Sequence, residues 1–335
     1  MIPAKSEFTL RGSFLMFDRD LPRELWGKEF DYMREAGMDT VVVLAVGHLH
    51  SDSADPLRYS PSPDGLLFPS RWVSSAHVDD RLEMVLSLAD ERGIKVYIGS
   101  LQTESDWTTG LELAALRAYN KRIAAEIVER YHSHRSFVGW YFPQEIWMNW
   151  VKYYGSGYYG TDSLRDFVAD MREIDSHKLT AATVVFKKEG NGLMPALASD
   201  ELESVMTGFL QTTRVDLLMP QDGAGAAAGA APIAELPSYF AAMAKARDKS
   251  GAGTALLAII ETFTSAPGLS NDRYSPAGIS RIEQQLNAVG PYVSGSISWI
   301  FGHDMSPQAT YYPAEAGMLY REYCARYGNA PTGQE

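Results

Sequence analysis

Residues 78–101 read VDDRLEMVLSLADERGIKVYIGSL, and this stretch joins a helix to a strand. Residues 78–92 are helix-like and residues 95–101 form a short apolar run of strand length. Gly93 joins the two in a tight turn. A helix that turns directly into an apolar strand is the unit from which parallel α/β folds are built.

The same order of segments recurs along the chain. The first apolar run is followed by a helix with Pro22 near its start and Gly37 placed to end it as a left-handed cap. The strand-like segments are 12–17, 40–46, 95–101, 137–142, 179–186, 215–219, 254–260 and 295–301. The other helix-like segments are 78–92, 111–131, 163–174, 200–211, 236–249, 276–289 and 314–327. The sequence therefore predicts eight strands that alternate with eight helices.

Strict alternation of strands and helices indicates a parallel sheet with right-handed crossovers. Residues 40–46, TVVVLAV, are β-branched and apolar on both faces, which is typical of a strand buried in such a sheet. Eight units predict a closed (β/α)8 TIM barrel, and the first strand-to-helix turn lacks the glycine-rich fingerprint of dinucleotide-binding sheets. We expect residues 1–328 to form one barrel domain and residues 329–335 to form a loose C-terminal tail.

The connections that follow the strands are much longer than those that precede them. Four of them stand out, at 49–77, 146–162, 187–199 and 222–234. In a (β/α)8 barrel these connections build the active-site face at the C-terminal ends of the strands. We therefore expect the functional site on that face.

The composition excludes several classes of protein. A net charge of -12 without a cluster of Lys and Arg argues against a nucleic-acid binder, and a local basic pocket stays open. Cys324 is the single cysteine, so no intramolecular disulfide is expected. Residues 1–8 lack the apolar core of a signal peptide, and no window is long enough to span a membrane. The chain as written is expected in the cytoplasm, or in the periplasm or outside the cell if a signal was removed, and its oligomeric state is left open.

Polar and aromatic side chains stand at nearly every expected strand end, where a barrel keeps its active site. Two of them are glutamates at the ends of long apolar runs: Glu145 follows residues 139–144 and Glu261 follows residues 255–260. The candidates for substrate binding are Asp18, His48, Gln102, Glu104, Gln144, Trp147, Gln221, Asp222, Trp299 and His303.

Glu145 and Glu261 end the fourth and seventh strands, which lie nearly opposite each other across an eight-stranded barrel. Glycoside hydrolysis needs such a pair, because one carboxylic acid protonates the leaving oxygen while the other carboxylate attacks or activates water. Trp147 and Trp299 offer the flat apolar surfaces against which sugar rings bind. The pattern predicts a glycosidase that acts on an oligo- or polysaccharide without a cofactor.

Two other classes stay open at this point. A barrel that binds carbohydrate and has lost catalysis would have the same architecture. A metal-dependent isomerase or hydrolase would need ligands at the strand ends, yet no His-X-His follows the first strand and no Cys/His cluster has zinc-like spacing. No metal site is therefore expected. Its candidate ligands would be His48, His50, Glu104, Asp222, His303 and Asp304.

The pair of strand-end glutamates resembles the large superfamily of retaining (β/α)8 glycosidases often called clan A. The resemblance implies that Glu145 is the general acid/base, that Glu261 is the nucleophile and that Trp299 lines the site. Members usually carry Asn immediately before the acid/base, where this chain has Gln144. An inverting mechanism with the same or a neighbouring pair is the nearest variant.

A closer similarity is to a bacterial family of unknown function that is grouped with glycosidase-like barrels. The matching stretches are GSFL at 12–15, AGMDTV at 36–41, GWYFPQE at 139–145 and MPQDG at 219–223. The family implies a glycosidase without indicating its sugar. It also implies that Asp222 is a site residue, which would orient a sugar hydroxyl or serve as the second carboxylate.

Overall fold

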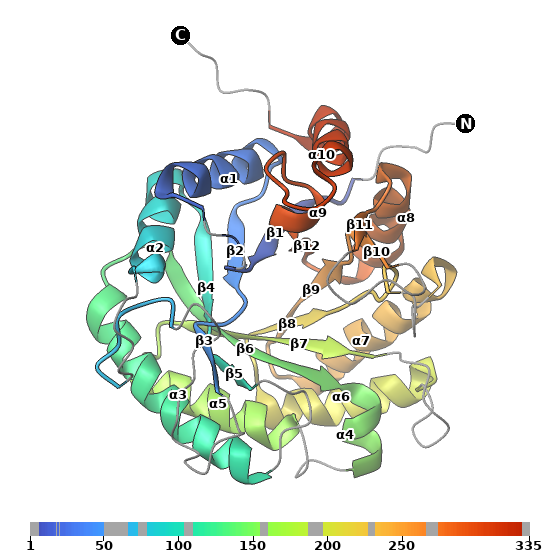
Figure 1. Cartoon of the computed structure of the whole chain (residues 1–335). Coiled ribbons are helices and arrows are strands. Elements are labelled where there is room, and N and C mark those ends of the chain that lie inside the picture. The colour runs from blue at the N-terminus through green and yellow to red at the C-terminus, as the bar shows by residue number, and fades with distance from the viewer. Residues whose placement is uncertain are drawn as a thin grey trace.

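Eight parallel strands close into a barrel in the computed structural model of the chain, with helices packed around them (Figure 1). Around the barrel the order is β1, β12, β9, β8, β7, β6, β4 and β2, and β1 pairs with both β2 and β12. The predicted (β/α)8 barrel is therefore confirmed. The strands are β1 (Leu10–Leu15), β2 (Thr40–Val43), β4 (Lys95–Gly99), β6 (Phe137–Trp147), β7 (Leu179–Val185), β8 (Leu217–Pro220), β9 (Ala255–Ile260) and β12 (Gly295–Ile300).

The helices that connect the strands also follow the predicted order. The structure describes residues 7–17, 19, 21–49, 66–72, 79–103, 110–154, 160–186, 197–226, 232–265 and 274–329. Each predicted helix is present within these ranges, and its ends lie within one helical turn of the expected positions. The helices are α1 (Arg23–Glu35), α2 (Arg81–Arg92), α3 (Gly110–Tyr131), α5 (Thr161–Ile174), α6 (Ser199–Thr213), α7 (Leu236–Ser250), α8 (Ile279–Val289) and α10 (Pro313–Tyr327).

Side-chain capping explains where α2 begins, and glycine conformation explains where α1 and α2 end. The carboxylate of Asp80 accepts a hydrogen bond from the backbone N–H of Glu83 at 2.9 Å, so α2 begins at Arg81 rather than at residue 78. Gly93 follows α2 with φ 62° and Gly37 follows α1 with φ 82°, and both angles lie in the left-handed region that favours glycine. The predicted cap at Gly37 is confirmed.

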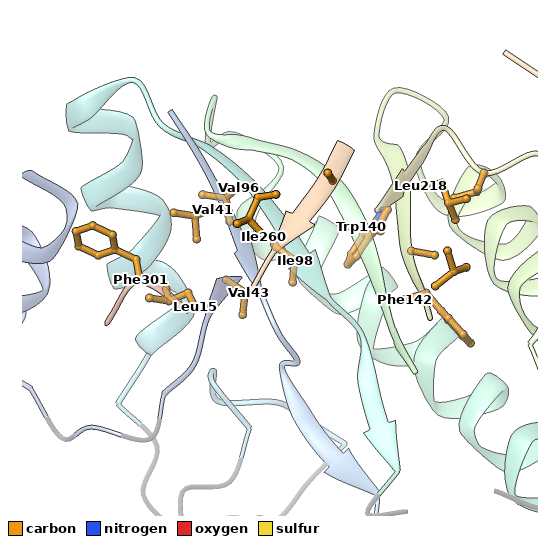
Figure 2. Close-up of a cluster of buried hydrophobic side chains, with 14 of the residues drawn as sticks. Leu15, Val41, Val43, Val96, Ile98, Trp140, Phe142, Leu218, Ile260 and Phe301 are labelled. Atoms are coloured by element: carbon orange, nitrogen blue, oxygen red, sulfur yellow. The ribbon is translucent and has the colours of Figure 1, made fainter. Parts of the chain in front are cut away.

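The packed side chains form two apolar layers, one inside the barrel and one between the barrel and the helices. Successive residues of β2 alternate between them: Val42 belongs to the inner layer, while Val41 and Val43 belong to the outer one. Figure 2 shows the outer layer, including Val41, Val43, Val96, Ile98, Trp140, Leu218 and Ile260. The inner layer includes Phe14, Val42, Tyr97, Tyr141, Met219, Ile259 and Ile297.

β6 is longer than the sequence predicted. It was expected to end at Phe142, but it continues to Trp147 and still pairs with β7. Its register shifts between Phe142, which pairs with Ala182, and Ile146, which pairs with Val184. Pro143 lies in this interval and has no N–H to donate, so the ladder is interrupted there and resumes beyond it. Glu145 consequently lies inside an irregular part of the strand rather than after its end.

Several short elements lie at the C-terminal ends of the barrel strands. The connection expected as a loop at 146–162 contains α4 (Met148–Tyr154). β3 (Gly47–Leu49) pairs with β5 (Leu101–Thr103), and β10 (Phe263–Thr264) pairs with β11 (Ser275–Pro276). The remaining short elements are η1 (Ile233–Glu235), which leads into α7, α9 (Phe301–Asp304), which follows β12, and η2 (Gly290–Tyr292), which lies between α8 and the start of β12.

The end of the chain is held against α1 as far as the structure describes it. Asn329, the first residue of the expected tail, donates its backbone N–H to the carbonyl of Glu35 and its Nδ2–H to the carbonyl of Arg34, both at 2.9 Å. Residues 330–335 lie outside the described residues, and the domain boundary at 328 stays a prediction. Among the described helices, none has the length and apolar character needed to cross a membrane.

Candidate active site

Gln221 connects Glu145 of β6 with β7 and with the end of β8 through hydrogen bonds. Gln221 lies two residues beyond Met219 of the inner layer, so the period of two places it on the inner side of the barrel. Its Nε2–H donates to Oε1 of Glu145 at 2.7 Å and to the hydroxyl of Thr183 at 3.5 Å. Side chains from β6, β7 and the end of β8 therefore meet just beyond the apolar interior, and Glu145 stays half-buried there.

Glu261 directly follows β9, two residues beyond Ile259 of the inner layer, and it is 4% exposed. Its Oε2 accepts hydrogen bonds from the backbone N–H groups of Gly225 at 2.6 Å and Ala226 at 2.9 Å. These donors belong to the turn that follows β8. The turn thus lies directly against the carboxyl group of Glu261 and fixes one of its oxygens.

Asp222 is fully buried behind this turn. Its Oδ1 accepts from the backbone N–H groups of Ala224 and Glu261, each at 3.2 Å. Its Oδ2 accepts from Nε2–H of Gln285 on α8 at 2.5 Å. Both oxygens are therefore hydrogen-bonded within the protein.

Arg281, one turn before Gln285 on α8, binds the backbone of the same region. Its Nη1–H donates to the carbonyl of Ala224 at 2.8 Å, and its Nη2–H donates to the carbonyls of Glu261, at 3.2 Å, and Phe263. Burial lowers the pKa of this guanidinium, whereas Asp222, Glu261 and Asp304 raise it. One half-buried cation thus faces three buried carboxyl groups.

The surroundings shift all three carboxyl groups toward the protonated form. Burial, and then the charge of Asp222, raise the pKa of Glu261 to about 8, against the backbone donors and Arg281, which lower it. Burial raises the pKa of Asp222 to about 6 and that of Asp304 to about 7. Asp304 lies on α9, where its Oδ2 accepts from the hydroxyl of Thr262 at 3.0 Å. Of the pair formed by Asp222 and Glu261, Glu261 holds a proton more strongly near neutral pH.

Of the remaining candidates, Gln144 and Trp147 lie on β6 close to Glu145 in the chain, and Gln102 lies on β5. Gln144 is buried, and its Nε2–H donates to the carbonyl of Leu101 at 3.4 Å. Gln102, the next residue of β5, is half-buried. Trp147 is half-buried at the end of β6, with its ring centroid 5.9 Å from that of Trp150 on α4.

Trp299 and His303 lie on the opposite part of the ring, at the end of β12 and on α9. Trp299 packs against the inner layer, with its ring centroid 5.2 Å from that of Phe14. His303 is half-buried next to the buried Asp304. The roles of both residues in substrate binding stay predictions. The other candidates, Asp18, Glu104 and the side chain of His48, lie outside the described residues.

The structure brings two pairs of predicted residues into contact: Gln221 with Glu145, and Asp222 with Glu261. Arg281 and Gln285 were not predicted from the sequence, because they lie on a helix and not at a strand end. A signal existed, since both lie beside the buried positions Ile282 and Leu286 on the inward face of α8. No group of three or more His, Cys, Asp or Glu side chains that could hold a metal occurs among the described residues.

Several solved structures are similar in fold to most or all of this chain. A structure from Bacteroides thetaiotaomicron described as a "putative alpha-L-fucosidase" is 23% identical, with a TM-score of 0.77 over 97% of this chain and 98% of that one. A beta-glucuronidase from an uncultured Clostridium species is 14% identical, with a TM-score of 0.53 over 95% of this chain and 50% of that one. A GH18 chitinase from Pseudoalteromonas aurantia is 12% identical, with a TM-score of 0.52 over 86% of this chain and 93% of that one.

This likeness is one of fold, and it agrees with the closed (β/α)8 barrel of this chain. Residues 10–311 match the family described as "Domain of unknown function (DUF4434)", and the chain belongs to that family. The predicted membership of a family of unknown function is confirmed. No curated protein sequence matches the chain.

Proposed function

We propose that this protein hydrolyses glycosidic bonds with Glu145 and Glu261 as its two working carboxyl groups. The observation that carries the proposal is their placement in the closed barrel. Glu145 lies near the end of the fourth barrel strand and Glu261 directly follows the seventh, with two strands between them on one side of the ring. The C-terminal ends of barrel strands are where (β/α)8 enzymes keep their catalytic groups.

In a retaining mechanism Glu145 acts first as the acid. Its carboxyl proton passes to the leaving glycosidic oxygen while a carboxylate oxygen of Glu261 attacks the anomeric carbon, so that a glycosyl ester forms as the glycosidic bond breaks. Water then attacks the same carbon, Glu145 takes a proton from that water, and the ester bond to Glu261 breaks. The donors of Gly225 and Ala226 would hold Oε2 of Glu261 in place throughout and support its negative charge.

One observation favours an inverting variant of the same site. Glu261 must be ionised to act as a nucleophile, but its raised pKa keeps it protonated near neutral pH. A protonated Glu261 suits a general acid that protonates the leaving oxygen, while Glu145 would serve as the base that activates water. The two variants predict opposite anomers of the released sugar.

The test is hydrolysis of a panel of nitrophenyl glycosides and oligosaccharides, with the product anomer read by proton NMR within the first minutes. The panel includes α-L-fucosides, β-D-glucuronides and chitin oligosaccharides, because the similar structures are described as enzymes of these kinds. Retention supports the nucleophilic role of Glu261, and inversion supports the acid role. No hydrolysis of any member would overturn the proposal.

Glu145→Gln and Glu261→Gln identify the working groups. Each should lower kcat by about 10²–10⁴-fold, the range that general acid–base groups supply. Glu203→Gln is the matched control, since Glu203 lies on α6 and pairs with Lys249 of α7. Full activity in either site variant would exclude that residue.

The other two classes give different results in the same experiments. A carbohydrate-binding barrel would bind oligosaccharides by calorimetry and release no sugar from them. A metal-dependent enzyme would lose activity after treatment with a chelator and regain it when a divalent ion is added.

A further inference from the structure

We infer that Asp222 is a positioning residue for Glu261, holding the turn after β8 against the end of β9, and does not contact the substrate. The inference rests on the proposed function of Glu261. In this role Asp222 does not orient a sugar hydroxyl. Arg281 and Gln285 of α8 help to hold the same part of the site in place.

The direction of the side chain is the first argument. Gln221 and Asp222 are consecutive, so the period of two sends them to opposite sides of the barrel wall. Gln221 reaches Glu145 inside the barrel, whereas Asp222 reaches Gln285 of the helical layer outside it. Asp222 has no exposed surface. A substrate bound at the barrel mouth would therefore meet Gln221 and not Asp222.

The hydrogen bonds of Asp222 are the second argument. Its Oδ1 bridges the backbone of the turn, at Ala224, and the backbone of Glu261 itself. The next two residues of the turn, Gly225 and Ala226, donate to the carboxyl group of Glu261. The buried carboxylate of Asp222 therefore holds the backbone of Glu261 in place. It also holds the turn whose N–H groups bind the Glu261 side chain. Movement of Asp222 would release both.

The contacts from α8 are the third argument. Gln285 donates to Oδ2 of Asp222 and, at 3.3 Å, to the carbonyl of Glu261. Arg281 donates to the carbonyl of Ala224, in the turn after β8, and to the carbonyl of Glu261, which directly follows β9. Helix α8 therefore holds the turn after β8 against the end of β9.

The charges of the groups around Glu261 also change the pKa of its carboxyl group. The charged groups near it are Asp222 after β8, Arg281 on α8, and Asp304 with His303 on α9. Asp222 raises the pKa of Glu261, while Arg281 lowers it. Removing the charge of Asp222 and keeping its shape should therefore make Glu261 easier to ionise.

Asp222→Asn makes that change with little rearrangement. The Asn Oδ1 still accepts from the two backbone N–H groups, and its Nδ2–H can donate to Oε1 of Gln285 once that amide turns over. Oε1 of Gln285 is buried and without a hydrogen-bond partner in the present arrangement. Asp222→Ala removes the bridge as well as the charge. Asp248→Asn is the control for the substitution itself, because Asp248 lies on α7 with an exposed side chain.

The first measurement is a carbon-13 NMR titration of the Glu261 carboxyl in protein labelled at glutamate Cδ, assigned with Glu261→Gln. Asp222→Asn should move the midpoint of this titration to lower pH, and Asp248→Asn should leave it unchanged. This readout needs no substrate. If no glycoside is hydrolysed, the proposed function fails while the titration still decides the link between Asp222 and Glu261. An unchanged midpoint in Asp222→Asn overturns the inference.

The second measurement is steady-state kinetics on the substrate found in the panel. In the pH profile of kcat/KM, the apparent pKa that belongs to Glu261 should shift to lower pH in Asp222→Asn. Asp222→Ala should lower kcat by about 10²-fold, as expected when a reacting group is misplaced by about 1 Å, and should change KM little. If Asp222→Ala does not fold, the profile of Asp222→Asn decides. A raised KM with unchanged kcat would show a substrate contact and overturn the inference.

Discussion

Replacing Gly225 with alanine should break the contact between the turn after β8 and Glu261. An ideal Cβ at this position would lie 2.4 Å from the carbonyl oxygen of Phe263, 2.9 Å from Cβ of Glu261 and 3.0 Å from its Oε2. Carbon–oxygen contacts ordinarily lie at about 3.3–3.6 Å. The turn must therefore withdraw by roughly 1 Å, because the nearest of these atoms belongs to the backbone and cannot rotate away.

The size of the effect follows from that movement. The hydrogen bond from Gly225 to Glu261 is 2.6 Å long, and a shift of roughly 1 Å takes it beyond the usual N–H···O range. Losing one or both donors costs about 1 kcal/mol each. Residual overpacking adds about 1–3 kcal/mol. Gly225→Ala should lower the free energy of unfolding by about 2–5 kcal/mol and kcat/KM by about 10²-fold.

Gly208→Ala provides a matched control for the same substitution. Gly208 lies on the exposed side of α6, and a Cβ there would have no neighbour within 4 Å. This variant should be more stable than the parent by about 0.5–1 kcal/mol, because alanine favours a helix over glycine. Urea denaturation measures the change in the free energy of unfolding of both variants. Their kcat/KM is measured with the substrate found in the panel. A Gly225→Ala protein as stable and as active as the parent would refute the reasoning.

Two further predictions concern groups outside the site. Arg19 and Glu29 form a buried ion pair at 2.9 Å, so Arg19→Met should cost about 3–5 kcal/mol in urea denaturation by leaving the carboxylate without its cation; a loss no larger than that of an exposed arginine would contradict this. Burial lowers the pKa of His134, but hydrogen bonds to Asp90 and Glu83 outweigh it and raise the pKa overall. The folded state therefore holds this proton more strongly, so the stabilisation is complete below about pH 6.5 and is lost as the pH rises through the folded pKa. His134→Gln should flatten the fall in stability from about pH 5.5 to 8.5, and an unchanged slope would exclude the effect.

The order of strands and helices could be predicted because it depends on local patterns. The apolar run of β2 and the glycines that end α1 and α2 each indicate their structure without reference to the rest of the chain. Glu145 and Glu261 were chosen as candidates in the same way, as acids at the ends of apolar runs. Their expected position on the C-terminal side of the barrel follows from the alternation alone.

The irregular end of β6 could not be predicted to the residue. The strand was predicted to stop at Phe142, directly before Pro143, which has no N–H to donate to the ladder. Pairing with Val184 and Val185 of β7 restores the strand beyond it. That pairing depends on a neighbouring strand, and a single segment does not indicate whether such a neighbour is in register.

The sequence alone determined the order of the elements and which residues lie near the strand ends, because the period of two and the β-then-α order are properties of the chain itself. Only the tertiary structure decided what each of them contacts. Gln221 and Asp222 look equivalent in the sequence, but one meets Glu145 inside the barrel and the other meets Gln285 in the helical layer. The physical reason is that hydrogen-bond partners distant in the chain are brought together by helix packing, and that packing also buries the carboxyl groups whose pKa values it raises.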